Sequence, residues 1–159
     1  MSMLAYEDTG SGEPVLFIAG TGGAGRTWQL HQVPAFLAAG YRCITFDNRG
    51  IGATENASGF STAQMVADTV ELIETVVGGP VRLVAMSMGA FIAQELLLAR
   101  SDLVRQAVLM GTRGRIDETR KAFRTAELEL TESGIELPAA YAAKAVSYTH
   151  LTLPTTPYV

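Results

Sequence analysis

The sequence predicts an α/β protein, a three-layer α/β/α sandwich around a mostly parallel sheet. Four short apolar runs rich in strand-forming residues, at 15–19, 41–46, 81–86 and 104–110, are separated by segments with helical spacing. Strands that alternate with helices form parallel sheets covered on both faces, which explains why these runs are mainly apolar. With 159 residues, 48% of them hydrophobic and 18% charged, the chain is long enough for one domain with a core.

The helices between these runs have recognisable starts and stops. Apolar residues at helical spacing predict a helix over 27–39, in which Pro34 must occupy the first turn or produce a kink, because proline lacks an N–H. Ser61 and Gln64 form the capping-box pattern S-x-x-Q, and apolar residues at helical spacing follow them. The Gly-Gly-Pro sequence that begins at Gly78 ends this helix.

The remaining segments divide the chain into three parts. MLAYED at 3–8 partly alternates and predicts an edge strand, and residues 89–100 predict a strongly apolar helix. The composition then changes twice, first to a charged helical stretch and then to a stretch of Thr, Pro and Tyr without helical spacing. We therefore expect residues 1–114 to form the sheet-containing core, 115–145 a helical segment and 146–159 a separate tail.

Charge and composition argue against several classes of partner. The net charge is −4 and the 12 basic residues form no run, so nothing favours nucleic acid or an anionic membrane. No segment reaches the roughly 18 apolar residues that a membrane span requires, and the N-terminus has no signal-peptide pattern. The single cysteine, Cys43, lies in an apolar run and is expected in the core, which favours the cytoplasm. No metal or cofactor is expected, and the oligomeric state stays open.

The loop after the first buried run allows two interpretations. FIAGTGGAGRTW at 17–28 is an apolar strand that leads into four glycines. Gly20, Gly22 and Gly25 fit G-x-G-x-x-G, the pattern of loops that hold a dinucleotide pyrophosphate on backbone N–H groups. Asp47 follows the next strand, close to where an acidic residue binds the ribose hydroxyls. One hypothesis is therefore a dinucleotide-binding domain.

A second motif points to nucleophilic catalysis. Ser87 lies between a buried strand and an apolar helix, with Ala85 two residues before it and Gly89 two residues after it. A direct turn from strand into helix forces its serine into a strained, exposed conformation and requires small neighbours, because strand and helix approach closely there. The helix N-terminus also favours negative charge that develops beside the hydroxyl. The alternative is that Ser87 only caps the helix.

Three motifs together resemble the α/β-hydrolase fold superfamily. AMSMG at 85–89 resembles its nucleophile elbow, FIAGTGGAGRTW its oxyanion loop, and FDNRGIGAT at 46–54 its loop with Asp-x-Arg-Gly-x-Gly-x-Ser/Thr. The resemblance covers residues 1–145 and is nearest to small serine esterases, enol-lactonases and cofactor-free haloperoxidases. It implies a partial α/β-hydrolase fold, in which 115–145 is the start of a helical cap.

The resemblance also implies roles for single residues. Ser87 would be the nucleophile, the backbone N–H groups of Thr21 and Met88 would form the oxyanion hole, and the substrate would be a small carboxylic ester or similar acyl compound. Epoxide hydrolases and haloalkane dehalogenases of this family use aspartate as the nucleophile, so the serine argues against those reactions. Asp47 and Arg49 would then be structural, through a turn hydrogen bond or a loop ion pair.

A serine nucleophile needs a base and an orienting acid, which this fold supplies in the order Ser, then Asp or Glu, then His. His31 precedes Ser87 and is interpreted as a surface or capping residue, whereas His150 lies in the tail. The acids after Ser87 follow no recognisable buried strand; they are Glu95, Asp102, Asp117, Glu118, Glu127, Glu129, Glu132 and Glu136.

The tail suggests why the acid and the base are not apparent. VSYTHLTLPTTPYV at 146–159 resembles the translated read-through of a sequencing adaptor or vector. We therefore expect a non-native tail on the N-terminal fragment of a hydrolase that is inactive alone, with a sheet that ends at 104–110 in an exposed edge or face. Two other functions stay open, a dinucleotide-binding domain and a non-catalytic interaction protein with the hydrolase fold.

Overall fold

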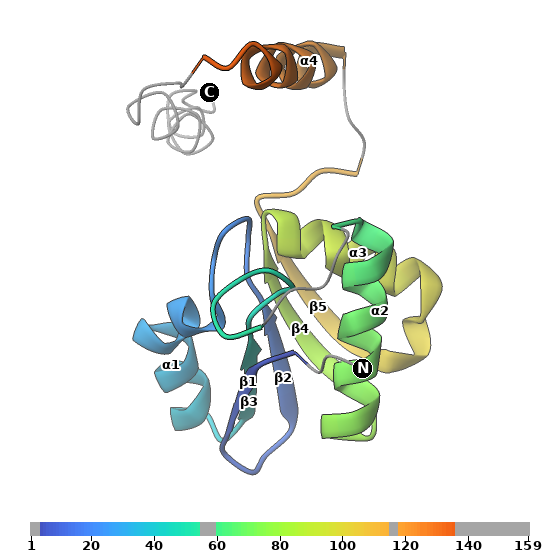
Figure 1. Cartoon of the computed structure of the whole chain (residues 1–159). Helices are drawn as coiled ribbons and strands as arrows, with labels where there is room; N and C mark the ends of the chain where they lie inside the picture. The colour runs from blue at the N-terminus through green and yellow to red at the C-terminus, as the bar shows by residue number, and fades with distance from the viewer. Residues whose placement is uncertain (1–3, 55–59, 115–117, 136–159) are drawn as a thin grey trace, which may run out of the picture. The chain divides into compact units, whose positions relative to one another are not determined.

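The structure, a computed structural model, describes residues 4–54, 60–114 and 118–135, and the chain divides into two units, Met1–Thr112 and Arg113–Val159. In the described part of the first unit, five strands form a sheet with the order β1-β3-β2-β4-β5 (Figure 1). β1 runs antiparallel to β3, and the other neighbouring pairs are parallel, which confirms the mostly parallel sheet. The strands are β1 (Tyr6–Thr9), β2 (Pro14–Ile18), β3 (Arg42–Phe46), β4 (Val81–Met86) and β5 (Val104–Met110).

Helices cover both faces of this sheet (Figure 1). A 3₁₀ turn, η1 (Gly25–Leu30), and α1 (Gln32–Ala38) lie against one face, whereas α2 (Thr62–Leu72) and α3 (Met88–Ala99) lie against the other. This arrangement is the predicted three-layer α/β/α sandwich.

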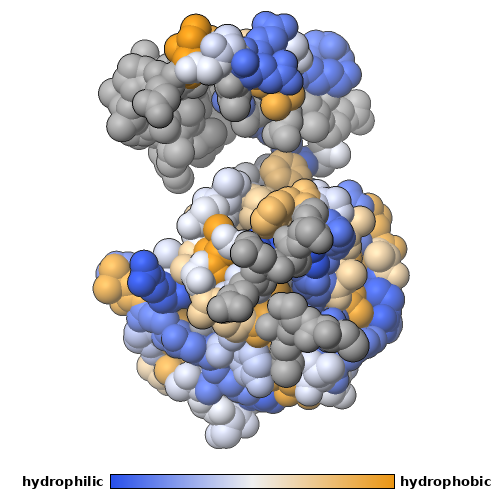
Figure 2. Space-filling model, viewed as in Figure 1, coloured by the Kyte–Doolittle hydropathy of each residue, from blue (hydrophilic) through white to orange (hydrophobic). Residues whose placement is uncertain are grey.

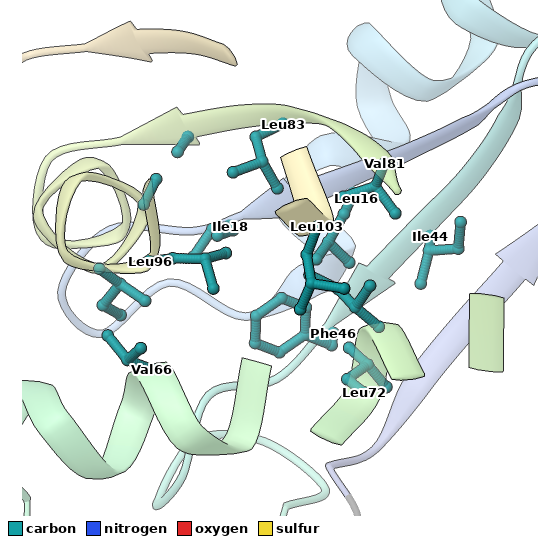
Figure 3. Packing of buried hydrophobic residues seen from close by; sticks show 14 of the residues in the cluster. Leu16, Ile18, Ile44, Phe46, Val66, Leu72, Val81, Leu83, Leu96 and Leu103 are labelled. Atoms are coloured by element: carbon teal, nitrogen blue, oxygen red, sulfur yellow. The ribbon is translucent and has the colours of Figure 1, made fainter. Parts of the chain in front are cut away.

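The central strand β2 shows why its run is apolar throughout. Val15 and Phe17 belong to the cluster on the α1 side, where the ring centroids of Phe17 and Trp28 are 5.5 Å apart. Leu16 and Ile18 belong to the opposite cluster and pack with residues of α2 and α3 (Figure 3). These four side chains are fully buried, so both faces of β2 contribute hydrophobic stabilisation.

The second helix begins and ends as predicted. Ser61 Oγ accepts a hydrogen bond from the Gln64 N–H at 3.2 Å, and the Gln64 side-chain oxygen accepts one from the Ser61 N–H at 3.0 Å. A π-helical turn, η2 (Ile73–Val77), extends α2 as far as Gly78. The φ of Gly78 is +73°, a left-handed conformation that glycine adopts without a steric penalty.

The helix expected over 27–39 is divided in two. η1 ends at Leu30 and α1 begins at Gln32, so Pro34 lies in the first turn of α1. A proline there removes no helical hydrogen bond, because N–H groups of the first turn have no partner within the helix. A continuous helix from Thr27 would have placed the proline in the helix interior, which explains the division.

β5 forms one edge of the sheet within the described residues, as the sequence predicts. A short 3₁₀ turn, η3 (Ser101–Leu103), leads from α3 into it. Val108 and Met110 of β5 are 50% and 37% exposed, and Met86 of β4, which pairs with Met110, is 44% exposed. The face of the molecule in Figure 2 carries hydrophobic residues scattered among hydrophilic ones.

The described part of the second unit contains α4 (Glu118–Glu132), within the segment 115–145 that the sequence predicts to be helical. Residues 115–117 and 136–159, and with them the tail and His150, lie outside the described residues. The three-part division of the chain therefore stays a prediction. Among the described helices, none combines the length and the apolar character that crossing a bilayer requires.

Shortening a core side chain tests the central position of β2. We expect Leu16→Ala to lower the free energy of unfolding by about 2–5 kcal/mol, because it leaves a cavity between β2 and the α2–α3 layer. Leu98→Ala is the matched control, since Leu98 on α3 is 83% exposed, and should change that free energy by less than about 0.5 kcal/mol. Urea unfolding followed by circular dichroism measures both variants. Equal losses would contradict the described core.

Candidate active site

The candidate site lies where β2 and β4 end side by side. The two strands are parallel, with Ile18 paired with Ala85, so Gly20 and Ser87 lie level with each other two residues further on. The chain passes from β2 to β3 on one side and returns to β4 on the other, so the strand order changes direction between β2 and β4. In open α/β sheets, ligands bind at such a point, outside the carboxyl ends of the strands.

Ser87 adopts the strained backbone conformation that its position predicts. With φ +53° and ψ −119°, it is the one non-glycine residue with positive φ in the described part of the chain. Its N–H donates to the Met110 carbonyl at 2.8 Å, and its carbonyl accepts from the Ala90 and Phe91 N–H groups at 3.0 and 3.2 Å. These hydrogen bonds hold a conformation that L-residues otherwise avoid. Ser87 occupies the N-cap position of α3, but its side chain makes no capping hydrogen bond, so the structure does not support a capping role for this side chain.

Small residues bring three backbone segments together around Ser87. A Cβ atom on Gly89 would overlap the Ile18 carbonyl oxygen and lie 2.6 Å from that of Ala19, so α3 approaches β2 more closely than a side chain at this position would allow. A Cβ atom on Gly20 would lie 3.1 Å from Ser87 Cβ and 3.7 Å from its Oγ. The predicted need for a small residue at Gly89 is confirmed.

Two backbone N–H groups next to these residues have no partner in the described structure. Within the described ranges, neither the Thr21 N–H in the glycine loop nor the Met88 N–H at the start of α3 donates a hydrogen bond. The first N–H groups of a helix have no carbonyl partner inside it and carry partial positive charge. An exposed serine beside such donors suits a reaction in which negative charge develops on a substrate oxygen.

The carboxylate of Asp47 links the glycine loop to the loop over 47–54. Its Oδ1 accepts a hydrogen bond from the Gly25 N–H at 2.7 Å, and its Oδ2 accepts one from the Ala53 N–H at 2.9 Å. Gly25 is the third glycine of the G-x-G-x-x-G pattern, and its N–H is directed to this carboxylate and not to a phosphate. The expected turn hydrogen bond of Asp47 is confirmed, and this geometry gives no support to ribose binding.

Arg49 forms the expected loop ion pair. Its Nε and Nη2 donate to Asp68 Oδ2 and Oδ1, each at 2.7 Å, so the pair is bidentate. The two side chains are only 10% and 17% exposed, and the hydrogen bonds to Asp68 raise the pKa of Arg49 above its ordinary value. The pair attaches the 47–54 loop to α2.

Possible acid and base residues do not meet Ser87 in the described structure. Within residues 4–54, 60–114 and 118–135, no histidine or carboxylate forms a hydrogen bond with the Ser87 side chain. His31 is exposed at the start of α1 and makes no capping hydrogen bond, which leaves it a surface residue. Glu95 is exposed on α3, and Asp102 pairs with Arg100 at 2.9 Å.

The other predicted acids are on α4 or outside the described residues. Glu118, Glu127, Glu129 and Glu132 belong to α4 in the second unit. Asp117, Glu136 and His150 lie outside the described residues. Among the residues that the structure describes, no group of three or more His, Cys, Asp or Glu side chains could hold a metal ion.

The motifs and this geometry agree with comparisons to known proteins. A family profile described as the alpha/beta hydrolase family matches residues 15–156. The chain belongs to the alpha/beta hydrolase family. The resemblance and the partial α/β-hydrolase fold that the sequence predicts are thereby confirmed. The matched range enters the segment 146–159, where a foreign tail stays a prediction.

Relatives of this chain carry several functional names. A Mycobacterium tuberculosis protein provisionally named non-heme bromoperoxidase BpoC is 66% identical over 145 residues, which are 91% of this chain and 55% of that protein. Its crystal structure has a TM-score of 0.81 at 67% identity and covers 89% of this chain and 53% of that one. An Acinetobacter baylyi protein, (E)-2-((N-methylformamido)methylene)succinate hydrolase, is 32% identical over 84% of this chain and 51% of that protein.

A plant enzyme extends the comparison. The crystal structure of the epoxide hydrolase VrEH1 from Vigna radiata has a TM-score of 0.66 at 29% identity, over 76% of this chain and 41% of that one. The chain spans about half the length of the curated relatives it matches.

Two contacts of this candidate site were not predicted from the sequence. Met110 supplies the carbonyl that accepts from the Ser87 N–H, and a Cβ atom on the following Gly111 would lie 3.8 Å from Ser87 N. The one sequence feature that could have indicated this contact is the glycine that follows the strand at 104–110. Asp68 lies in the second predicted helix, and nothing in the sequence around it indicates that it pairs with Arg49.

The close approach at Gly89 gives a direct test of the site's framework. Gly89→Ala should lower the free energy of unfolding by about 1–3 kcal/mol or more, because the added Cβ overlaps a backbone oxygen of β2. Gly79→Ala is the matched control, since a Cβ there meets no atom within 4 Å and the φ is not positive. Thermal unfolding followed by circular dichroism measures both. Equal stability of the two variants would contradict the packing of α3 on β2.

Proposed function

We propose that this chain carries the nucleophile and the oxyanion hole of a serine hydrolase that acts on a small carboxylic ester or similar acyl compound. The observation that supports the proposal most directly is the strained, exposed Ser87 beside Gly20 of the glycine loop. Backbone strain persists only where surrounding contacts hold it, and it clusters at active sites. A helix cap would require no such conformation.

In the proposed reaction, Ser87 Oγ attacks the carbonyl carbon of the substrate while its proton passes to a general base. The carbonyl π electrons move onto oxygen, and the Thr21 and Met88 N–H groups donate hydrogen bonds to this oxyanion. Collapse of the tetrahedral intermediate expels the alcohol, which takes the proton from the base, and leaves an acyl-enzyme. Water, deprotonated by the same base, then attacks the acyl-enzyme, and a second tetrahedral intermediate collapses to release the acid and regenerate Ser87. Donors that are fixed before the reaction lower the barrier because they need no reorganisation.

The base and its orienting acid are placed outside the described residues in this proposal. The chain spans about half the length of its curated relatives, so the activity of the whole protein, with its substrate, is part of the proposal. The chemistry of a serine nucleophile, which attacks carbonyl carbon, supports the acyl class of substrate. A cytoplasmic location belongs to the same proposal, supported by the buried free thiol of Cys43.

Covalent labelling tests the nucleophile. A fluorophosphonate probe should label a chimaera in which this chain is joined to the part of the Mycobacterium tuberculosis relative that has no counterpart here, and Ser87→Ala should abolish the label. Ser101→Ala, at an exposed serine of η3, is the matched control and should keep it. Intact-protein mass spectrometry measures the adduct. A label that survives Ser87→Ala would contradict the assignment of the nucleophile.

Turnover by the 159-residue chain alone tests where the base lies. We expect hydrolysis of p-nitrophenyl acetate close to the uncatalysed background, because no described histidine or carboxylate contacts the Ser87 side chain. A steady-state absorbance assay measures the rate. Esterase activity that His150→Ala removes would place the base in the segment 146–159 and would overturn the expectation of a non-native tail there.

A further inference from the structure

We propose that Asp47 is a positioning residue for the oxyanion donor at Thr21, because its carboxylate fixes the far end of the glycine loop. The inference rests on the proposed function. In this role Asp47 binds protein backbone and not a ribose. Its carboxylate accepts a hydrogen bond from the Gly25 N–H at 2.7 Å and one from the Ala53 N–H at 2.9 Å. We call this pair of hydrogen bonds the Asp47 clasp.

The glycine loop has few other polar restraints. Gly23 N–H donates to the Gly20 carbonyl at 3.0 Å, which is a bond within the loop. Among the described residues, the bond to Asp47 is the one hydrogen bond that ties the N–H groups of residues 21–25 to another segment. Thr21 therefore lies between two fixed points, the end of β2 and the clasp at Gly25, and the direction of its N–H depends on both.

Side-chain packing does not replace the clasp. A cavity of about 530 Å³ opens between the two loops and is lined by residues of both, including Gly22, Arg26 and Ile51, and by Asp47 itself. Gly22 has a φ of +70°, and a Cβ atom there would meet nothing within 4 Å. The middle of the glycine loop is thus open on this side, and its ends determine where its N–H groups point.

Close backbone approaches make the clasp specific. A Cβ atom on Gly25 would lie 2.8 Å from the backbone N and O of Phe46, and a Cβ atom on Gly52 would overlap Asp47 Oδ2. Glycine at both positions lets the two backbones reach the carboxylate. The geometry therefore leaves room for hydrogen-bond donors from both loops and for no larger side chain.

Asp47 is itself anchored to the sheet. Its N–H donates to the Ala5 carbonyl at 2.9 Å, and its carbonyl accepts from Thr54 Oγ1 at 2.7 Å. Thr54 Oγ1 also accepts from the Ala5 N–H at 2.9 Å, and Thr54 is buried. A continuous set of hydrogen bonds thus runs from the start of β1 through Asp47 to the glycine loop, which is the supporting shell that a precisely oriented donor requires.

A carboxylate is needed because both partners of the clasp donate. An asparagine side chain has one acceptor oxygen and one NH₂ donor, so Asp47→Asn keeps the shape and sets a donor against one backbone N–H group. This variant removes one arm of the clasp without changing the volume. Asp8→Asn is the matched control, since Asp8 loses the same charge and an ion pair with Arg42 at 2.6 Å, away from both loops.

Amide hydrogen exchange in the ¹⁵N-labelled 159-residue chain tests the clasp without any turnover. Asp47→Asn should accelerate exchange at Gly25 or Ala53 at least tenfold and shift the Thr21 amide resonance, whereas Asp8→Asn should do neither. Unchanged exchange at both Gly25 and Ala53 in Asp47→Asn would overturn the clasp.

Titration with phenylboronic acid tests the link to the oxyanion donor. The Ser87 oxygen bonds to boron and releases its proton to solvent, which gives a tetrahedral boronate anion with an oxygen at the oxyanion position. The Thr21 and Met88 amides should shift in the wild type, and Asp47→Asn should weaken affinity about tenfold and reduce the response of Thr21 while Met88 still responds. Equal affinity and equal Thr21 response would overturn the positioning role. No binding to the wild type would count against the proposed function. The hydrogen-exchange experiment would still test the Asp47 clasp, because it does not depend on boronate binding.

Discussion

The rest of the structure depends on the close approach of the α3 N-terminus to the end of β2. Ile18 pairs with Ala85, and Gly89 lies so near the Ile18 carbonyl oxygen that no Cβ atom would fit between them. This contact fixes the level at which α3 begins and leaves Ser87 alone to turn the chain from β4 into α3. The positive φ of Ser87 is therefore a consequence of packing a helix tightly on a sheet, and the buried core on that face sustains it.

The sequence allows two functions for the glycine loop, a phosphate site and an oxyanion hole. In both, backbone N–H groups lie close to a negative charge. Phosphate binding uses several successive N–H groups around one anion, whereas an oxyanion hole combines one donor from the loop with one from the elbow. The Gly25 N–H is directed to Asp47, and the Thr21 N–H has no partner among the described residues. The orientation of the Gly25 and Thr21 N–H groups therefore favours the oxyanion hole over the phosphate site. The spacing of the glycines alone does not determine this orientation.

Much of the framework could be predicted because its signals are local. The runs at 81–86 and 104–110 coincide with β4 and β5, since short segments rich in apolar and strand-forming residues favour strands. The capping box at Ser61 is likewise local, and so is the elbow at Ser87. The bond from the Ser87 N–H to Met110 could not be predicted, because it joins segments that only the strand order brings together. The partner of Arg49 was unpredictable for the same reason.

The contacts that shape the elbow come from one continuous part of the chain. The acceptor for the Ser87 N–H lies at the end of β5, the groups that donate to its carbonyl lie on α3, and Gly20 follows β2. The geometry of the proposed nucleophile therefore needs neither a base nor an acid, and positioning can be separated from proton transfer. Such a separation has a precedent, since serine proteases without their triad keep roughly 10³–10⁴-fold catalysis through the oxyanion hole and binding. Met86, Val108 and Met110 on one face of β4 and β5 are partly exposed in the described structure. A polypeptide segment that covered this face would thus add stability to a site whose geometry is already set by residues 18–111.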